Sequence, residues 1–117
     1  MDNCLFCKIV RGEVPSRKVY EDDNVFAFHD IHPLAPVHFM IIPKKHVDSL
    51  AHLAESDQAV MGKIMVLASQ LARQQGCSDG FRTIVNTGRV ARQDVMHVHV
   101  HIIGGGEVLP TMLPRQA

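Results

Sequence analysis

Histidine and valine alternate near the end of the sequence, in the run His97-Val98-His99-Val100-His101. Alternate residues of a β-strand share one face, so the three imidazoles are predicted to point one way and the valines into the core. Imidazole titrates near neutral pH, ligates metals and attacks phosphorus. The run therefore predicts a row of reactive groups on one face of a sheet.

Distance argues against one metal ion shared by the whole row. A strand rises about 3.3 Å per residue, so the Cα atoms of His97 and His101 would lie ~13 Å apart, whereas a zinc–nitrogen bond measures about 2.0 Å. We therefore expect separate roles for the three histidines. Residues 86–94 and 104–106 flank them and are rich in small and polar side chains. Such loops let main-chain N–H groups approach an anion, which indicates phosphorus or acyl chemistry.

Two cysteines form a second candidate site. Cys4 and Cys7 have the Cys-x-x-Cys spacing that can supply half of a Cys₂His₂ zinc site. Two alternatives are buried thiols that pack as small hydrophobic groups and a redox pair, which is disfavoured because no βαβ pattern follows. Cys77 stands alone, and we expect it to pack near the end of a long helix.

Composition narrows the classes of function. A length of 117 residues predicts a single domain over residues 1–117. Twelve basic residues balance twelve acidic ones, which favours neither a nucleic acid nor a membrane as partner. No apolar stretch approaches the roughly 20 residues that span a bilayer, and the start does not resemble a signal peptide. We therefore expect a cytoplasmic protein.

Two helices and five strands are predicted to position these groups. A short helix is expected over residues 5–10 and a long one over residues 57–75, capped by Ser56 or Asp57 and ended by Gly76. The strands are expected at residues 18–21, 25–28, 38–42, 81–86 and 95–103. Their close spacing favours an antiparallel sheet in an α+β domain.

The long helix carries two adjacent apolar seams. The first holds Val60, Ile64, Leu67 and Leu71, and the second holds Met61, Met65, Ala68 and Ala72. Both seams can face one core, or the wide apolar face can pack on its own sheet and on a partner chain.

The run from His97 to Ile103 resembles the signature of the histidine triad (HIT) family. Further segments resemble that family in the same order over nearly the whole chain, at residues 5–9, 13–15, 20–23, 27–31, 35–39, 42–46 and 85–86. The likeness is greatest to the Hint branch, the purine nucleoside phosphoramidases. The resemblance implies a five-stranded antiparallel sheet with one long and one short helix, paired into a homodimer.

The resemblance also implies residue roles. His99 matches the nucleophile that forms a nucleotidyl-histidine intermediate, and His101 and His38 match imidazoles that contact the phosphate and its leaving group. Asp30 matches the carboxylate that binds the ribose hydroxyls, although it can instead be a turn residue. The residues that match the walls around the base are Leu5, Phe6, Ile9, Phe28, His29, Ile31 and Met40. Those that match the phosphate-facing loop are Asn86, Gln93, Asp94 and Val95.

Some members of the family bind zinc through a cysteine pair and two histidines. The matching residues here are Cys4, Cys7, His46 and His97. Such a zinc would be structural, would tie the N-terminal helix to the sheet, and would remove His97 from catalysis. Other Hint-like members lack the cysteines, so the family does not require zinc.

The resemblance implies a hydrolase or transferase that cleaves nucleoside 5′-phosphoramidates of the AMP–amine type, with a purine nucleotide product and no cofactor needed for catalysis. The alternatives are a dinucleoside polyphosphate hydrolase, a nucleotide-binding protein with little turnover, and a metal-dependent hydrolase. Two positions depart from the family pattern, with Arg92 where glycine is usual and Asp94 where serine is frequent. The arginine can reshape the phosphate loop or add a cation for a longer phosphate chain.

Overall fold

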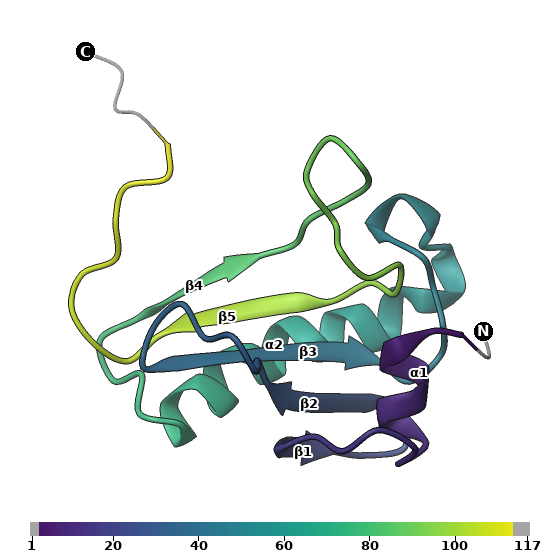
Figure 1. The fold of residues 1–117 in the computed structure, drawn as a ribbon, viewed down its shortest axis with the longest axis horizontal. Helices are drawn as coiled ribbons and strands as arrows, with labels where there is room; N and C mark the ends of the chain where they lie inside the picture. Colours follow the sequence, from purple (N-terminus) through teal and green to yellow (C-terminus); the bar gives the residue numbers. More distant parts are fainter. Residues whose placement is uncertain (1–2, 114–117) are drawn as a thin grey trace.

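The computed structural model describes residues 3–113, which form one five-stranded sheet with a helix on each side (Figure 1). Its elements are α1 (Leu5–Val10), β1 (Lys18–Glu21), β2 (Val25–His29), β3 (Val37–Pro43), α2 (Gln58–Gln74), β4 (Phe81–Ile84) and β5 (Val100–Gly104), with two short 3₁₀ turns at Leu50–His52 and Glu55–Asp57. The sheet order is β1-β2-β3-β5-β4, and every neighbouring pair is antiparallel. The predicted α+β class with a five-stranded antiparallel sheet is confirmed.

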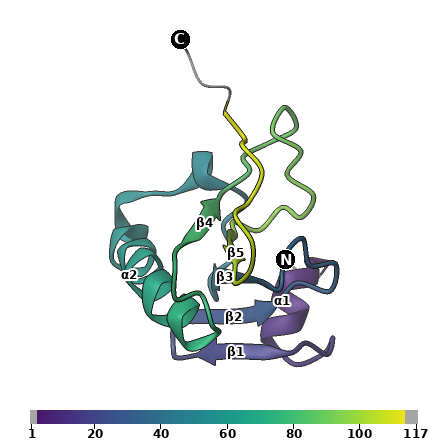
Figure 2. The same cartoon turned by 90° about the vertical axis from the view of Figure 1, so that its left-hand side faces the viewer.

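Side chains alternate between two hydrophobic cores on opposite faces of the sheet, one under α2 and one under α1 (Figure 2). The core under α2 takes its strand residues from Val25, Ala27, Val37, Phe39, Ile41, Val100 and Ile102. The core under α1 contains Phe6, Ile9, Phe26, Phe28, Met40 and Ile42. Since alternate residues share a face, the even-numbered positions of β3 and the odd-numbered position His101 of β5 lie on the α1 side.

The long helix buries one face, which both predicted seams share. Its buried residues are Ile64, Leu67, Ala68, Leu71 and Ala72. Met65 of the second seam is instead 52% exposed, and Val66 beside it is 76% exposed. Residues of both seams therefore pack into the same core, and Met65 and Val66 form an apolar edge of α2 that is exposed. The homodimer that the resemblance implies stays a prediction.

The two ends of α2 differ in how they are capped. At its C-terminus, Gly76 adopts φ +106°, and the N–H of Cys77 donates to the Ala72 oxygen at 2.9 Å. This left-handed glycine ends the helix as predicted, and Cys77 is buried beside it. At the N-terminus Asp57 stands at the capping position, but its carboxylate accepts the N–H of Ala54 at 2.8 Å instead of one in the first turn of α2.

The last strand begins later than predicted, at Val100 instead of Val95. Its neighbour β3 pairs Ile41 with Val100 and ends at Pro43, whose nitrogen carries no hydrogen. The N–H of Val98 instead donates to the main-chain oxygen of Val47 at 2.8 Å. His97 and His99 therefore precede β5, and only His101 lies within the ladder.

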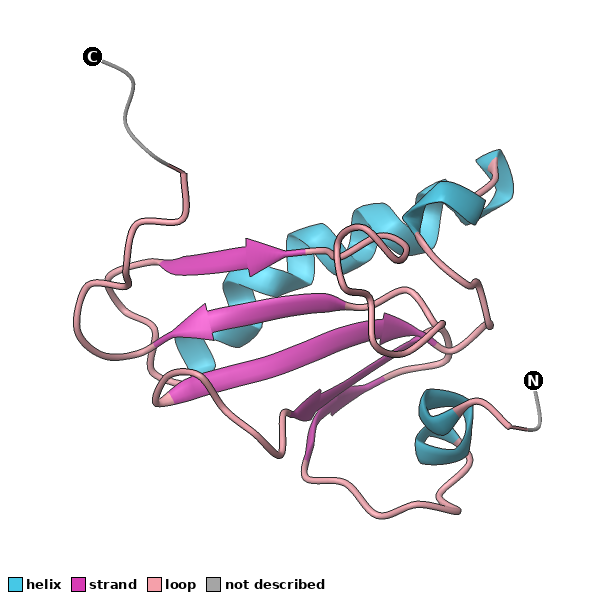
Figure 3. Ribbon diagram, turned by 45° about the horizontal axis from the view of Figure 1, so that its top comes forward, coloured by secondary structure: helices cyan, strands magenta, loops and turns pink. Residues whose placement is uncertain are grey.

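Strand β4 is also shorter than predicted, since it ends at Ile84 rather than at Asn86. Asn86 belongs to the loop that follows, where its amide donates to the main-chain oxygen of Ala91 at 2.9 Å. This loop connects β4 to the histidine segment (Figure 3) and stands out from the sheet (Figure 1). Among residues 3–113, neither helix is long and apolar enough to cross a membrane.

Packing of α2 on the sheet predicts a contrast between two adjacent residues. Ile64 is fully buried and Met65 is half exposed. Ile64→Ala should lower the free energy of unfolding by about 2–5 kcal/mol because it leaves a cavity. The matched Met65→Ala should change it by no more than about 0.5 kcal/mol. Urea denaturation of both variants measures this, and equal losses would contradict the arrangement.

Candidate active site and metal centre

The three histidines of the triad lie in three different neighbourhoods. His97 faces the cysteines near α1, His99 lies beside Phe6, and His101 pairs with His38 of β3. His97 and His99 are almost fully buried, whereas His101 is partly exposed. The rings of His99 and His101 are nevertheless neighbours, with centroids 5.0 Å apart. This arrangement agrees with the separate roles that strand geometry predicts.

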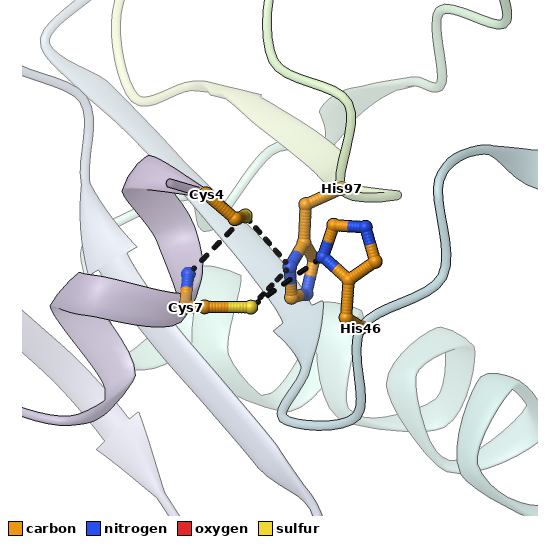
Figure 4. A group of neighbouring side chains, drawn as sticks. All are labelled: Cys4, Cys7, His46 and His97. Atoms are coloured by element: carbon orange, nitrogen blue, oxygen red, sulfur yellow. Dashed lines mark hydrogen bonds between the residues drawn. The ribbon is translucent and has the colours of Figure 1, made fainter. Parts of the chain in front are cut away.

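Cys4, Cys7, His46 and His97 converge as the sequence predicts (Figure 4). The Nδ1 atom of His97 lies 3.4 Å from Cys4 Sγ and 3.6 Å from Cys7 Sγ, and the Nδ1 atom of His46 lies 3.4 Å from Cys7 Sγ. Tetrahedral zinc with bonds of about 2.3 Å to sulfur and 2.0 Å to nitrogen places these atoms about 3.6 Å apart. The four side chains can therefore hold a metal ion such as zinc.

Hydrogen bonds outside this cluster prepare both imidazoles as ligands. The Nε2 atom of His97 lies 2.7 Å from the Pro43 carbonyl oxygen, and that of His46 lies 2.7 Å from Asp48 Oδ1. Since these oxygens only accept, each Nε2 carries the proton and each Nδ1 turns a lone pair toward the thiols. Burial raises the pKa of the Cys7 thiol to about 11, and a bound cation would favour its thiolate.

His99 is held in one tautomer by its own chain. Its Nδ1 atom lies 2.7 Å from the main-chain oxygen of His97, so Nδ1 carries the proton and donates it. The second nitrogen, Nε2, therefore has a free lone pair in the neutral ring. Asp94 Oδ1 lies 3.6 Å from it, and the edge of Phe6 packs on the ring with centroids 5.1 Å apart. The geometry provides a buried, oriented imidazole with one available nucleophilic nitrogen.

His38 and His101 form a second imidazole pair on the same face. Residues 40 and 101 are directly opposite in the β3–β5 ladder, which makes His38 a diagonal neighbour of His101. Their nitrogens Nε2 and Nδ1 lie 2.9 Å apart. Burial lowers the pKa of each imidazole below its usual value, and the Asp30 carboxylate opposes that effect.

Asp30 makes the turn contact that was the alternative to a ribose-binding role. Its Oδ1 atom accepts the N–H of His32 at 2.8 Å. Its Oδ2 atom lies 3.4 Å from Nε2 of His38. The carboxylate therefore both shapes the turn after β2 and lies next to the imidazole pair.

Amide side chains stabilise the loop before His97. Gln93 accepts the N–H of Gly88 at 2.9 Å through Oε1, and its Nε2 donates to the oxygens of Asp48 at 2.7 Å and Val95 at 2.9 Å. Arg92 has φ +60° and is the one non-glycine residue with a positive φ in the part of the chain described. This left-handed conformation explains why glycine suits the position.

The residues predicted to surround a base are only partly brought together. Four of them, Phe6, Ile9, Phe28 and Met40, share the core under α1, and Val95 packs against it. Leu5 is 45% exposed and Ile31 is 84% exposed, while His29 is half-buried at the end of β2. An open cavity of about 490 Å³ lies beside the cluster and is lined by Asn3, Cys4, Leu5, His46, Asp48, Asp94, Val95 and Met96.

Three contacts of the site involve residues that the sequence does not single out. The main-chain oxygen of Pro43 and the carboxylate of Asp48 orient the two histidines of the cluster. The main-chain N–H of Leu34 donates to Nδ1 of His38 at 3.1 Å. The roles of main-chain groups cannot be predicted from residue types. Asp48 could not be distinguished in the sequence from other acidic residues on the surface.

Known proteins resemble this chain in sequence and in fold. The HIT domain model matches residues 11–108. Protein HitA of Neisseria gonorrhoeae is 49% identical over 104 residues, covering 89% of this chain and 97% of that protein. The structure of a HIT family hydrolase from Clostridium thermocellum has a TM-score of 0.90 at 41% identity, covering 97% of this chain and 99% of that one. A hypothetical histidine triad nucleotide-binding protein from Sulfolobus tokodaii has a TM-score of 0.80 at 34% identity, covering 97% and 77%.

The likeness thus covers nearly all of the chain in both sequence and three-dimensional structure, and it includes the segment that carries the three histidines. The protein belongs to the histidine triad (HIT) family.

Proposed function

We propose that the protein is a hydrolase that cleaves nucleoside 5′-phosphoramidates through a covalent bond between His99 and the nucleotide. The observation that carries this proposal is the hydrogen bond from Nδ1 of His99 to the His97 oxygen, which leaves Nε2 as a free nucleophile. Relatives described as a HIT family hydrolase and as a nucleotide-binding protein support the class of reaction and ligand.

The proposed reaction has two displacements at one phosphorus atom. Nε2 of His99 forms a bond to the α-phosphorus while the bond from phosphorus to the amine breaks, and the amine leaves after taking up a proton from water. Water then attacks the same phosphorus, the bond to His99 breaks, and the nucleoside monophosphate is released. Two in-line displacements give net retention of configuration at phosphorus.

Neighbouring groups fit supporting roles in this proposal. The imidazole of His101 can donate an N–H that stabilises charge on the phosphoryl oxygens, and His38 lies beside it at 2.9 Å. The Asp30 carboxylate can accept from two ribose hydroxyls, since it has more acceptor sites than its turn contact uses. Leu5 and Ile31, which are 45% and 84% exposed, are the predicted base-contacting residues that offer apolar surface.

A dinucleoside polyphosphate hydrolase is the second candidate, and Arg92 favours it. The residue keeps an unfavourable φ of +60° on an exposed loop next to Gln93 and Asp94. Arg89 is exposed on the same loop. Two cations there suit a leaving group that carries further phosphates, whereas an amine leaving group has no use for them.

We also propose that Cys4, Cys7, His46 and His97 hold one structural zinc ion. The donor set is two thiolates and two imidazoles, which zinc favours. When bound, the metal would cross-link the start of α1 to the segment after β3 and to the segment before β5. It would hold the ring of His97 and leave its main-chain oxygen to orient His99.

The covalent step is tested by trapping the intermediate. His99→Ala should lower turnover of adenosine 5′-phosphoramidate by at least about 10³-fold because the nucleophile is lost. Protein quenched at alkaline pH during turnover should carry a nucleotidyl group on the peptide that contains His99, as measured by mass spectrometry. The control His52→Ala alters an exposed histidine outside the site. Inversion at a chiral phosphorus would show direct attack by water and overturn the proposal.

The loop arginine separates the two candidate substrates. Arg92→Gly should raise the free energy of unfolding by about 0.5–1 kcal/mol because glycine adopts positive φ without strain, whereas Arg92→Ala should not. If the loop binds a polyphosphate, both variants should lower kcat/KM for diadenosine polyphosphate about 5-fold, as expected for one lost charged contact. The kcat/KM for the phosphoramidate should stay unchanged. Equal effects on both substrates would contradict a role in leaving-group choice.

Metal analysis tests the zinc site. Wild-type protein without an affinity tag should contain about one zinc per chain, and Cys4→Ser should lose it. At a free zinc concentration 100 times the Kd, the metal should add about 2.7 kcal/mol to stability, so a chelator should lower the melting temperature. Cys77→Ala is the matched control, since that cysteine lies outside the cluster. An unchanged melting temperature in metal-free protein would contradict the proposal.

A further inference from the structure

A main-chain group decides where the proton of His38 resides. The N–H of Leu34 lies 3.1 Å from Nδ1 of His38 and can only donate. Nδ1 must therefore accept, and a neutral imidazole whose Nδ1 accepts carries its proton on Nε2. The loop segment that presents this N–H contains prolines at positions 33 and 36, whose fixed φ restricts the backbone on both sides of Leu34.

The constraint continues from His38 to His101. Nε2 of His38 lies 2.9 Å from Nδ1 of His101, and the competing acceptor, Oδ2 of Asp30, is more distant at 3.4 Å. The proton on Nε2 of His38 is thus donated to His101. Nδ1 of His101 is then an acceptor in turn, so the proton of its neutral ring is on Nε2.

An additional proton is disfavoured at both sites. A second proton on His38 would have to bind Nδ1, where it would point at the N–H of Leu34. A second proton on His101 would likewise bind Nδ1 and point at the N–H of His38. Burial opposes the charged form of each ring as well, and His99 adds to that effect at His101. The carboxylates facing the pair act in the opposite direction, Asp30 on both rings and Asp94 on His101.

We propose that Leu34 is a positioning residue whose main-chain N–H locks the His38–His101 pair in one neutral arrangement, with an N–H donor at Nε2 of His101. The side chain of Leu34 is 78% exposed, so its contribution to the site comes from the main chain. The consequence for catalysis rests on the proposed function: His101 stabilises a phosphoryl oxygen as a neutral donor and transfers no proton to the leaving group.

The same arrangement distinguishes this pair from the cysteine cluster. Asp30, His38 and His101 also lie close enough to hold a metal ion. A metal at Nε2 of His38 would displace the proton from that atom, and the proton could not move to Nδ1, which Leu34 occupies. In the cysteine cluster the Nδ1 lone pairs of His46 and His97 already face the thiols. The His38–His101 pair is therefore arranged to donate hydrogen bonds, whereas the cysteine cluster is arranged to bind a metal ion.

Histidine ¹⁵N NMR of the free protein tests the proposal without any substrate. At neutral pH, both His38 and His101 should show a protonated Nε2 and an unprotonated Nδ1. A coupling across the hydrogen bond should join the Leu34 amide nitrogen to Nδ1 of His38, and another should join Nε2 of His38 to Nδ1 of His101. A protonated Nδ1 in either ring would overturn the proposal, whatever the outcome of the His99 trapping experiment.

Two variants at the exposed position 34 isolate the main-chain group. Leu34→Pro removes the N–H, whereas Leu34→Ala removes the side chain and keeps it. With the N–H removed, His38 should populate both tautomers and titrate about one pH unit higher than in Leu34→Ala, since one hydrogen bond is worth about 1 kcal/mol. Identical titration in the two folded variants would overturn the proposal. If Leu34→Pro fails to fold, the couplings in wild-type protein still decide.

Discussion

The hydrogen bond between Nδ1 of His99 and the main-chain oxygen of His97 connects the two halves of the site. His97 is held at both ring nitrogens, by the Pro43 oxygen at 2.7 Å and by the thiols of Cys4 and Cys7. A residue fixed at so many atoms has little freedom to turn, so its carbonyl offers a fixed acceptor to His99. Any change that lets the His97 ring rotate would also move that acceptor.

The sheet separates packing from chemistry. The core under α2 takes Val37, Phe39 and Ile41 from β3 and Val100 and Ile102 from β5. The opposite face carries His38 and His101 and is covered over part of its length by α1. Because the strands alternate strictly, one face can be packed densely while the other holds imidazoles at the spacing of the ladder. Packing of the core under α2 thereby helps to fix the distance between His38 and His101, which lie on the opposite face of the sheet.

Much of this arrangement follows from local sequence pattern. The limits of α1 and β1 agree with prediction. The two cysteines and two histidines that the family resemblance assigns to one metal site also converge. The predicted start of β5 was wrong because Pro43 ends its neighbour β3. No pattern within residues 95–103 reveals this effect. Leu34 was missed because its contribution is a main-chain N–H, and its exposed apolar side chain gives no hint of it. The pairing of two chains through α2 stays a prediction.

The position of β5 between β3 and β4 has a consequence for biosynthesis. Among residues 3–113, β5 is synthesised after the other four strands, and it fills the gap between β3 and β4. A chain still emerging from the ribosome can complete the β1–β2–β3 meander and α2, yet it leaves the edge of β3 unpaired along Val37–Pro43. Such an edge, whose residues are all apolar except His38, is a template for pairing with another chain. Premature termination before residue 100 should therefore yield aggregates instead of a small folded fragment, and a strand supplied in trans with the sequence of β5 should suppress them.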